Sequence, residues 1–133
     1  MAITVVRDQT ARMRHEVRVG GYIFAADASA DEGGDGLAPN PHDLYDAALG
    51  ACESLTVLWY ANRKGIPVET IEVTVERDKS QERTGTYRLD TRLKLGGKLT
   101  DDQRRELLAV ASKCPVHKLM TSVRTIIETS LVK

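Results

Sequence analysis

The sequence predicts an α+β fold, because its strand-like and helix-like segments come in runs. Alternating apolar and polar residues, the pattern of half-buried strands, occupy the N-terminal part and a middle stretch. Helical periodicity occupies one long segment and two shorter ones. The predicted order is βββ-α-ββ-αα-β, which differs from the single alternation of strand and helix typical of parallel α/β proteins. At 133 residues the chain has the length of one domain, so we expect a single domain over residues 1–133.

Three strands are expected before the long helix. Residues 3–6 form the first, and residues 13–19 alternate with a period of two. Gly20 and Gly21 are typical of a two-residue hairpin turn, after which residues 22–24 begin the return strand. The acidic, glycine-rich segment 28–39 follows, and we expect it to be a mobile surface loop.

A long, buried central helix is predicted over residues 41–64. Asn40 can cap its N-terminus, Pro41 suits the first helical position, and Gly65 suits the C-terminal cap. Gly50 costs about 1 kcal/mol in a helix interior, which suggests that something packs closely there. We expect this helix to pack on an antiparallel sheet through an apolar stripe of Leu44, Ala48, Ala51, Leu55 and Leu58.

The second half of the chain predicts two strands, two helices and a last strand. Residues 69–78 and 86–95 alternate as a hairpin. A helix begins after Thr100, which forms a capping box with Gln103. Pro115 opens a third, short helix, and residues 123–132 alternate as the last strand.

Composition excludes several function classes. Nineteen Lys and Arg balance nineteen Asp and Glu, which argues against a nucleic-acid partner, since phosphate binding needs surplus basic residues. No segment approaches the roughly 20 apolar residues of a membrane span. The N-terminus shows no signal-peptide pattern, so we expect a cytoplasmic protein without a membrane partner. Two cysteines cannot build a disulfide scaffold, so they matter, if at all, as reactive thiols or ligands.

The two cysteines are the main candidates for chemistry, although each has a structural alternative. Cys52, in mid-helix, is either a small buried apolar residue or a reactive thiol. Cys114 precedes Pro115 and therefore caps the next helix, whose free amides predict a lowered thiol pKa; the alternative is a cap without chemistry. His117 shares a helical face with Cys114. These residues and His42 suggest zinc only weakly, because no closely spaced cysteine pair exists, and we expect no metal and no cofactor.

Three segments resemble the OsmC/Ohr family of osmotically inducible and organic hydroperoxide resistance proteins. Residues 39–52, PNPHDLYDAALGAC, resemble that family's first-cysteine helix. Residues 64–67, KGIP, resemble its helix exit, and residues 114–118, CPVHK, resemble its second-cysteine motif. The order of elements also matches, so the resemblance covers essentially the whole chain.

This resemblance implies an OsmC-like fold, an intertwined homodimer and a thiol peroxidase. In such an enzyme Cys52 attacks an organic hydroperoxide and becomes a sulfenic acid, which Cys114 resolves to a disulfide. A dithiol reductant, lipoyl-type or other, then restores both thiols.

The resemblance also implies an arginine that keeps the attacking thiol ionised. In this sequence Arg12 and Arg14 both lie in the expected N-terminal region, and we favour Arg12. The family orients its arginine with a glutamate ten residues before the first cysteine, where this chain has His42.

Asp43 or Glu53 are the acidic residues that can replace that glutamate. The substitution at position 42 motivates an alternative: an OsmC-like ligand-binding or stress-associated protein without catalysis. The residues implied in the site are thus Cys52 and Cys114 with Arg12 or Arg14, supported by His42, Asp43, Glu53 and His117.

Overall fold

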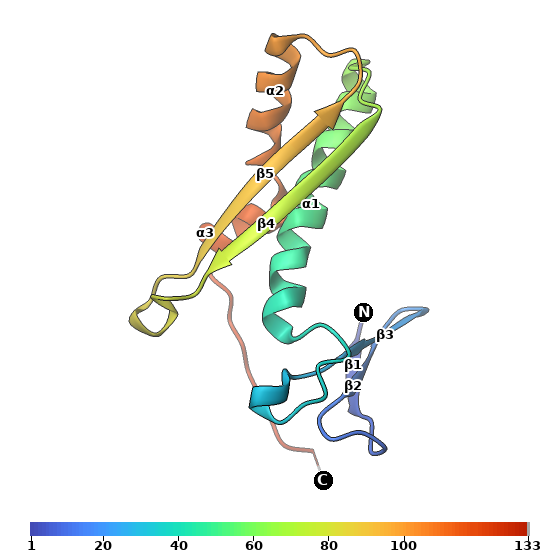
Figure 1. The fold of residues 1–133 in the computed structure, drawn as a ribbon, viewed down its shortest axis with the longest axis vertical. Coiled ribbons are helices and arrows are strands. Elements are labelled where there is room, and N and C mark those ends of the chain that lie inside the picture. Colours follow the sequence, from blue (N-terminus) through green and yellow to red (C-terminus); the bar gives the residue numbers. More distant parts are fainter. Residues whose placement is uncertain (133) are drawn as a thin grey trace. The chain divides into compact units, whose positions relative to one another are not determined.

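The computed structural model describes residues 1–132, which form two compact units (Figure 1). The first is Met1–Tyr45, and the second begins at Asp46. Helix α1, Pro41–Lys64, begins in the first unit and continues into the second, with the bounds that its capping residues predicted. Lys133 lies outside the described residues, and the expectation of a single domain stays a prediction.

The first unit is built on a three-stranded antiparallel sheet in the order β1-β2-β3. The strands are β1 (Ile3–Arg7), β2 (His15–Val19) and β3 (Tyr22–Ala26). Gly20 provides the positive φ, 57°, that the hairpin turn between β2 and β3 requires. The three predicted strands are therefore confirmed.

The loop after β3 folds around a buried carboxylate. Asp27 is 5% exposed and accepts the amide hydrogens of Ala28 at 2.8 Å and Leu37 at 3.3 Å. A short 3₁₀ turn, Ala30–Glu32, lies between them. The glycine-rich segment is thus a hydrogen-bonded loop, and its mobility stays a prediction.

The second unit packs helices on a β-hairpin. Strands β4 (Thr70–Asp78) and β5 (Arg88–Gly96) pair antiparallel, and a 3₁₀ turn, Glu82–Thr84, connects them. Helix α2 (Asp101–Ala111) shares one side of this hairpin with α1, as Figure 1 shows. Helix α3 (Pro115–Thr121) follows. The buried core joins α1, the turn after it and α2 through Val57, Ala61, Ile66, Leu107 and Ala111.

The predicted buried face of α1 is wrong. Leu55 is 67% exposed, and Ala48 and Ala51 are exposed as well. Periodicity shows which residues share a helix face, whereas the packing partner decides which face is covered. The buried residues of α1 are instead Asp46, Leu49, Gly50, Glu53, Val57 and Ala61.

Gly50 lies where α1 packs closely against the hairpin. A Cβ atom at this position would lie 3.0 Å from Cγ2 of Val75 on β4. The expectation that another element packs closely against Gly50 is therefore confirmed. The small residue at position 50 permits this close approach of the helix to β4.

The capping predictions hold, whereas the last strand does not. Thr100 and Gln103 form the predicted capping box of α2. Asn40 and Asp43 make the same reciprocal pair of bonds at the start of α1, at 2.8 and 3.0 Å. Residues 123–132 form no strand, because a strand needs a partner edge and the rest of the described chain pairs none with them. No helix in residues 1–132 is long and apolar enough to cross a membrane.

Candidate active site

The two cysteines, far apart in the sequence, meet where α1 passes the first turn of α3. Cys52 is half-buried in the middle of α1, and Cys114 is fully buried as the N-cap of α3. The backbone amide of Val116 donates to Sγ of Cys52 at 3.5 Å. The amide of His117 donates to Sγ of Cys114 at 3.3 Å. Successive amides of one helical turn thus bind both sulfur atoms.

Local sequence explains why this turn offers its amides. The first amide groups of a helix have no partner within the helix, and Pro115 has no amide hydrogen at all. The amides of Val116 and His117 are therefore left for the sulfur atoms. On the other side of Cys52, the hydroxyl of Thr56 lies 4.0 Å from Sγ, one helical turn along α1. Cys52 is thus placed between a hydroxyl and an amide.

The pKa of the Cys114 thiol is raised, which corrects the expectation of a lowered pKa. Burial is the main cause, and the amide of His117 opposes it. A hydrogen bond with Cys52 and the charges of Cys52 and Glu53 raise the pKa further. The capping position was predicted correctly, but the removal of Cys114 from water outweighs the helix terminus. Burial therefore favours the protonated form of Cys114.

Glu53 is a buried carboxyl next to this cysteine pair. Its side chain is 5% exposed, and the hydroxyl of Thr91 on β5 donates to its Oε1 at 3.1 Å. Burial raises the pKa of Glu53, while the hydrogen bond from Thr91 and the charge of His117 oppose that shift. The structure therefore brings together four of the predicted residues: Cys52, Glu53, Cys114 and His117.

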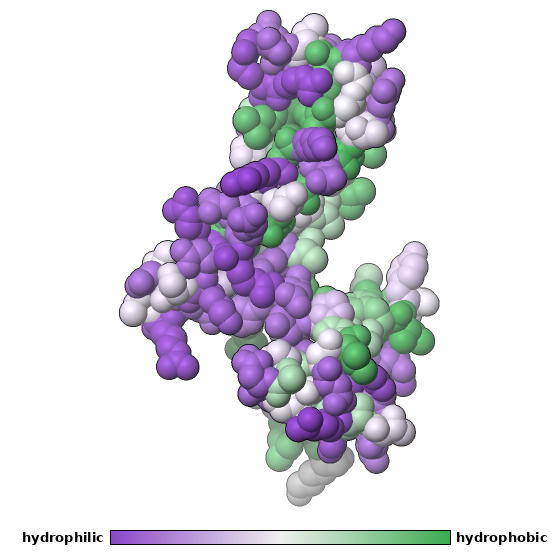
Figure 2. Space-filling model, viewed as in Figure 1, coloured by the Kyte–Doolittle hydropathy of each residue, from purple (hydrophilic) through white to green (hydrophobic). Residues whose placement is uncertain are grey.

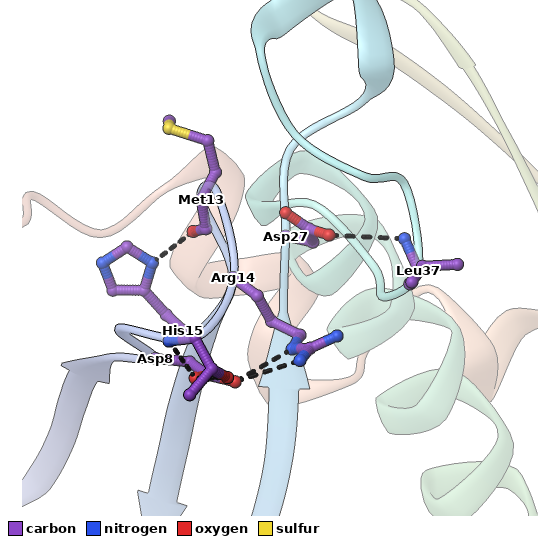
Figure 3. A network of polar contacts seen from close by, with 7 residues as sticks. Asp8, Met13, Arg14, His15, Asp27 and Leu37 are labelled. Carbon is purple, nitrogen blue, oxygen red and sulfur yellow. Dashed lines mark hydrogen bonds and ion pairs between the residues drawn. The ribbon is translucent and has the colours of Figure 1, made fainter.

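The two candidate arginines belong to the first unit and differ in their surroundings. The guanidinium of Arg14 donates to Oδ2 of Asp8 from Nε at 3.2 Å and from Nη2 at 3.0 Å, as Figure 3 shows. Thr10 and then Arg14 lower the pKa of Asp8 to about 2. Arg12 is exposed. The role of either arginine towards Cys52 stays a prediction.

His42 and Asp43 lie in the first turn of α1. The carboxylate of Asp43 accepts the amide hydrogen of Asn40, so Asp43 contributes to the cap of the helix. His42 is exposed. Whether either residue replaces the family glutamate stays a prediction. Residues 1–132 contain no group of three or more His, Cys, Asp and Glu side chains that could hold a metal ion.

Sequence reasoning missed two features of the site. Thr91 lies on the inward-facing side of β5, between Leu89 and Leu93. A polar residue in that apolar row was a usable signal for a buried hydrogen bond. The amide of Val116 left no signal, because every residue type except proline carries one.

Comparison with known proteins agrees with the fold. The sequence model of the family described as OsmC-like protein matches residues 33–129. No curated protein matches the chain. The solved OsmC-like protein of Mycoplasma pneumoniae is similar in fold, with a TM-score of 0.76 and 20% identity over 92% of this chain and 87% of that one.

Two similar structures carry more specific names. One is an organic hydroperoxide resistance protein OsmC from Legionella pneumophila, with a TM-score of 0.63 and 22% identity over 92% of this chain and 90% of that one. The other is the organic hydroperoxide resistance protein OhrB of Bacillus subtilis, with a TM-score of 0.59 and 22% identity over 92% of both chains. At such identities the likeness shows the fold alone.

Proposed function

Because the chain belongs to the OsmC-like family, we propose that it is a cysteine-based thiol peroxidase that reduces organic hydroperoxides. The family includes enzymes of this kind, and two similar structures carry names that refer to organic hydroperoxide resistance. The observation that carries the proposal is the meeting of Cys52 and Cys114. Two free thiols that meet, one half-buried and one buried, are what a peroxide-driven disulfide requires.

The reaction takes three steps. The thiolate of Cys52 attacks the distal oxygen of the hydroperoxide, the O–O bond breaks, and the alkoxide leaves as an alcohol after taking up a proton. Cys52 is then a sulfenic acid. The sulfur of Cys114 attacks it, water leaves, and a disulfide forms. An external dithiol, lipoyl-type or other, is oxidised as it reduces that disulfide to the two thiols.

The residues around Cys52 suit the first step. Thiolate character is what makes a cysteine nucleophilic, and the amide of Val116 donates to Sγ. The family resemblance assigns a second stabilising group, the guanidinium of Arg12 or Arg14. The variants Arg12→Ala and Arg14→Ala distinguish the two candidates. Only the substitution that removes the activating arginine should slow the oxidation of Cys52.

A single-turnover reaction tests the proposal. Reduced protein mixed with one equivalent of cumene hydroperoxide should lose both titratable thiols and form a Cys52–Cys114 disulfide, seen by peptide mass spectrometry. Cys52→Ser should consume no peroxide. Cys114→Ser, the matched control, should consume one equivalent and stop at an oxidised Cys52. Two thiols that stay titratable after excess hydroperoxide would contradict the proposal.

His42 supports a second candidate function, that of a ligand-binding or stress-associated protein without catalysis. In the family position of the arginine-orienting glutamate, a histidine carries no fixed negative charge. In this case Cys52 would react slowly with hydroperoxides. The variant His42→Glu separates the two functions. If it oxidises Cys52 much faster than wild type does, the wild-type chain lacks the group that catalysis needs, which favours the non-catalytic protein.

We also propose a homodimer, which the family resemblance implies. Large apolar side chains are exposed on the three-stranded sheet, and Figure 2 shows hydrophobic residues at its surface. On α1, Leu55 is 67% exposed and Trp59 is 59% exposed. Soluble proteins rarely leave so much large apolar surface uncovered. Sedimentation equilibrium should give twice the mass of one chain; a monomer at micromolar concentration would contradict the dimer.

A further inference from the structure

Resting on the proposed peroxidase function, we propose that Glu53 moves the proton of the second step: it takes the proton from Cys114 and gives it to the hydroxide that leaves Cys52. The family resemblance assigns no such task to the residue after the first cysteine. The proposal gives Glu53 a role in disulfide formation rather than in the orientation of an arginine.

The second step needs a group of this kind. Cys114 is 0% exposed, and burial favours its protonated form, whereas the attacking species must be a thiolate. Water has little access to a fully buried sulfur. A titratable side chain close to the thiol is therefore the simplest acceptor for its proton.

Glu53 is the carboxyl placed for that task. It follows Cys52 directly on α1 and is 5% exposed on the face of the helix that packs against the hairpin. Its charge acts on Cys114, and the charge of His117, whose amide binds the Cys114 sulfur, acts on Glu53. The carboxyl thus shares one environment with both thiols.

The groups that face Glu53 leave its carboxyl able to change protonation. From β5 it receives the uncharged hydroxyl of Thr91. From the start of α3 it faces Cys114 and His117, and on its own helix it adjoins Cys52. Within residues 1–132 no lysine or arginine forms an ion pair with it. A carboxyl in such surroundings has a raised pKa, which brings it closer to the pH at which a general base operates.

The proposed step is balanced. The sulfur of Cys114 forms a bond to the Cys52 sulfur as the S–O bond of the sulfenic acid breaks. The thiol proton passes to Glu53, and Glu53 returns a proton to the departing hydroxide, which leaves as water. The hydroperoxide has already supplied the oxidising equivalents in the first step. Because Glu53 takes up one proton and gives one back, it begins and ends this step ionised.

Glu53→Gln tests the role, because glutamine keeps the shape and can still accept the bond from Thr91. After one equivalent of cumene hydroperoxide, rapid acid quench and mass spectrometry resolve the sulfenic acid from the disulfide. We expect disulfide formation to slow at least about tenfold relative to Cys52 oxidation and to lose the pH dependence that a titrating carboxyl gives it. Glu53→Asp should recover part of the rate.

A second measurement needs no peroxide. In Cys52→Ser protein Cys114 is the single thiol, and its ultraviolet thiolate absorbance gives its pKa. Adding Glu53→Gln should lower that pKa, because a negative charge beside the thiolate is removed. An unchanged pKa of Cys114 would mean that Glu53 does not act on this thiol, and it would overturn the proposed proton transfer.

The kinetic outcomes separate this proposal from the function on which it rests. Wild-type protein that forms no disulfide with the hydroperoxide overturns the peroxidase and, with it, the proton transfer. Wild-type protein that forms the disulfide, with a Glu53→Gln variant of equal rate and equal pH profile, overturns only the role of Glu53. A slowed variant whose pH profile keeps its shape also overturns it, because a merely structural defect has that signature.

Discussion

Two buried carboxylates on α1 lie seven residues apart on the same face, and their partners differ. Asp46 and Glu53 are each 5% exposed. Asp46 accepts Nε of Arg77 at 2.5 Å and the hydroxyl of Tyr87 at 2.7 Å. Glu53 receives the hydroxyl of Thr91 alone among the described residues. The first carboxylate is neutralised by a cation, and the second is not.

The difference separates structure from chemistry. A buried charge persists only where partners compensate for the water it has lost. Asp46 has such partners, so it fastens α1 to the hairpin. Glu53 lacks a cation and lies beside two thiols, so its ionised form is stabilised less and its pKa is raised. The following predictions test this contrast.

The largest effect is expected at Asp46. Asp46→Ala removes the carboxylate to which Arg77 and Tyr87 both donate. We expect the unfolding free energy to fall by about 3 kcal/mol, the lower end for a broken buried pair, because Arg77 is 29% exposed. Urea unfolding followed by the fluorescence of Trp59 measures the loss. A change below about 1 kcal/mol would mean that Asp46 does not fasten the helix.

Tyr87 provides the next effect, and its size depends on pH. Burial, and then Asp46, raise the pKa of Tyr87 to about 12. A folded pKa above the unfolded value of about 10 means that this stabilisation is full below about pH 10 and is lost as pH rises through about 12. Tyr87→Phe should cost about 1.5 kcal/mol at neutral pH.

Absorbance titration of the phenols checks the shift directly. Wild-type protein should show one of its four tyrosines titrating near pH 12, and Tyr87→Phe should lose that transition. If the late transition persists in the variant, it belongs to another tyrosine, and Asp46 would then have a weaker partner than the geometry indicates.

Gly50, between the two carboxylates, gives a smaller effect. Alanine gains about 1 kcal/mol of helix propensity, but its Cβ would lie 3.0 Å from Val75. Since overpacking costs about 1–3 kcal/mol, we expect Gly50→Ala to destabilise by about 1 kcal/mol net. Ala51→Gly, on the exposed side of the same turn, is the matched control for propensity. A stabilised Gly50→Ala protein would show that the helix and the hairpin can separate without cost.

These features mark the limit of what the sequence could predict. Local signals fixed the bounds of α1, since Asn40, Pro41 and Gly65 act on their immediate neighbours. The prediction of the buried face of that helix was wrong. Leu55 is exposed and Glu53 is buried, because the hairpin covers the side of the helix that carries Glu53. Helical periodicity contains no information on which side a partner will cover.

The candidate site divides in the same way. The resemblance selected Cys52 and Cys114, and the structure brings them together. The capping position of Cys114 followed from Pro115, but the direction of its pKa did not, because burial is a property of the packed chain. The alternation over residues 123–132 failed for a related reason: it describes an extended segment, and no local signal supplies the edge with which a strand pairs.

The smallest change in stability is expected for Glu53→Gln, and its dependence on pH is the informative part. The folded-state pKa of Glu53 is raised, so the wild-type carboxyl stabilises the fold while it is protonated and loses that contribution as pH rises through the folded pKa. Glutamine does not titrate. The variant should therefore match wild type within about 1 kcal/mol at low pH and gain relative to it as pH rises. At neutral pH, Asp46→Asn should instead be less stable than wild type, since it removes a paired charge rather than an unpaired one. Urea unfolding of both variants across a pH series measures the two trends. If the unfolding free energies of both variants, relative to wild type, change with pH in the same way, the two carboxylates contribute equally to stability and the contrast fails.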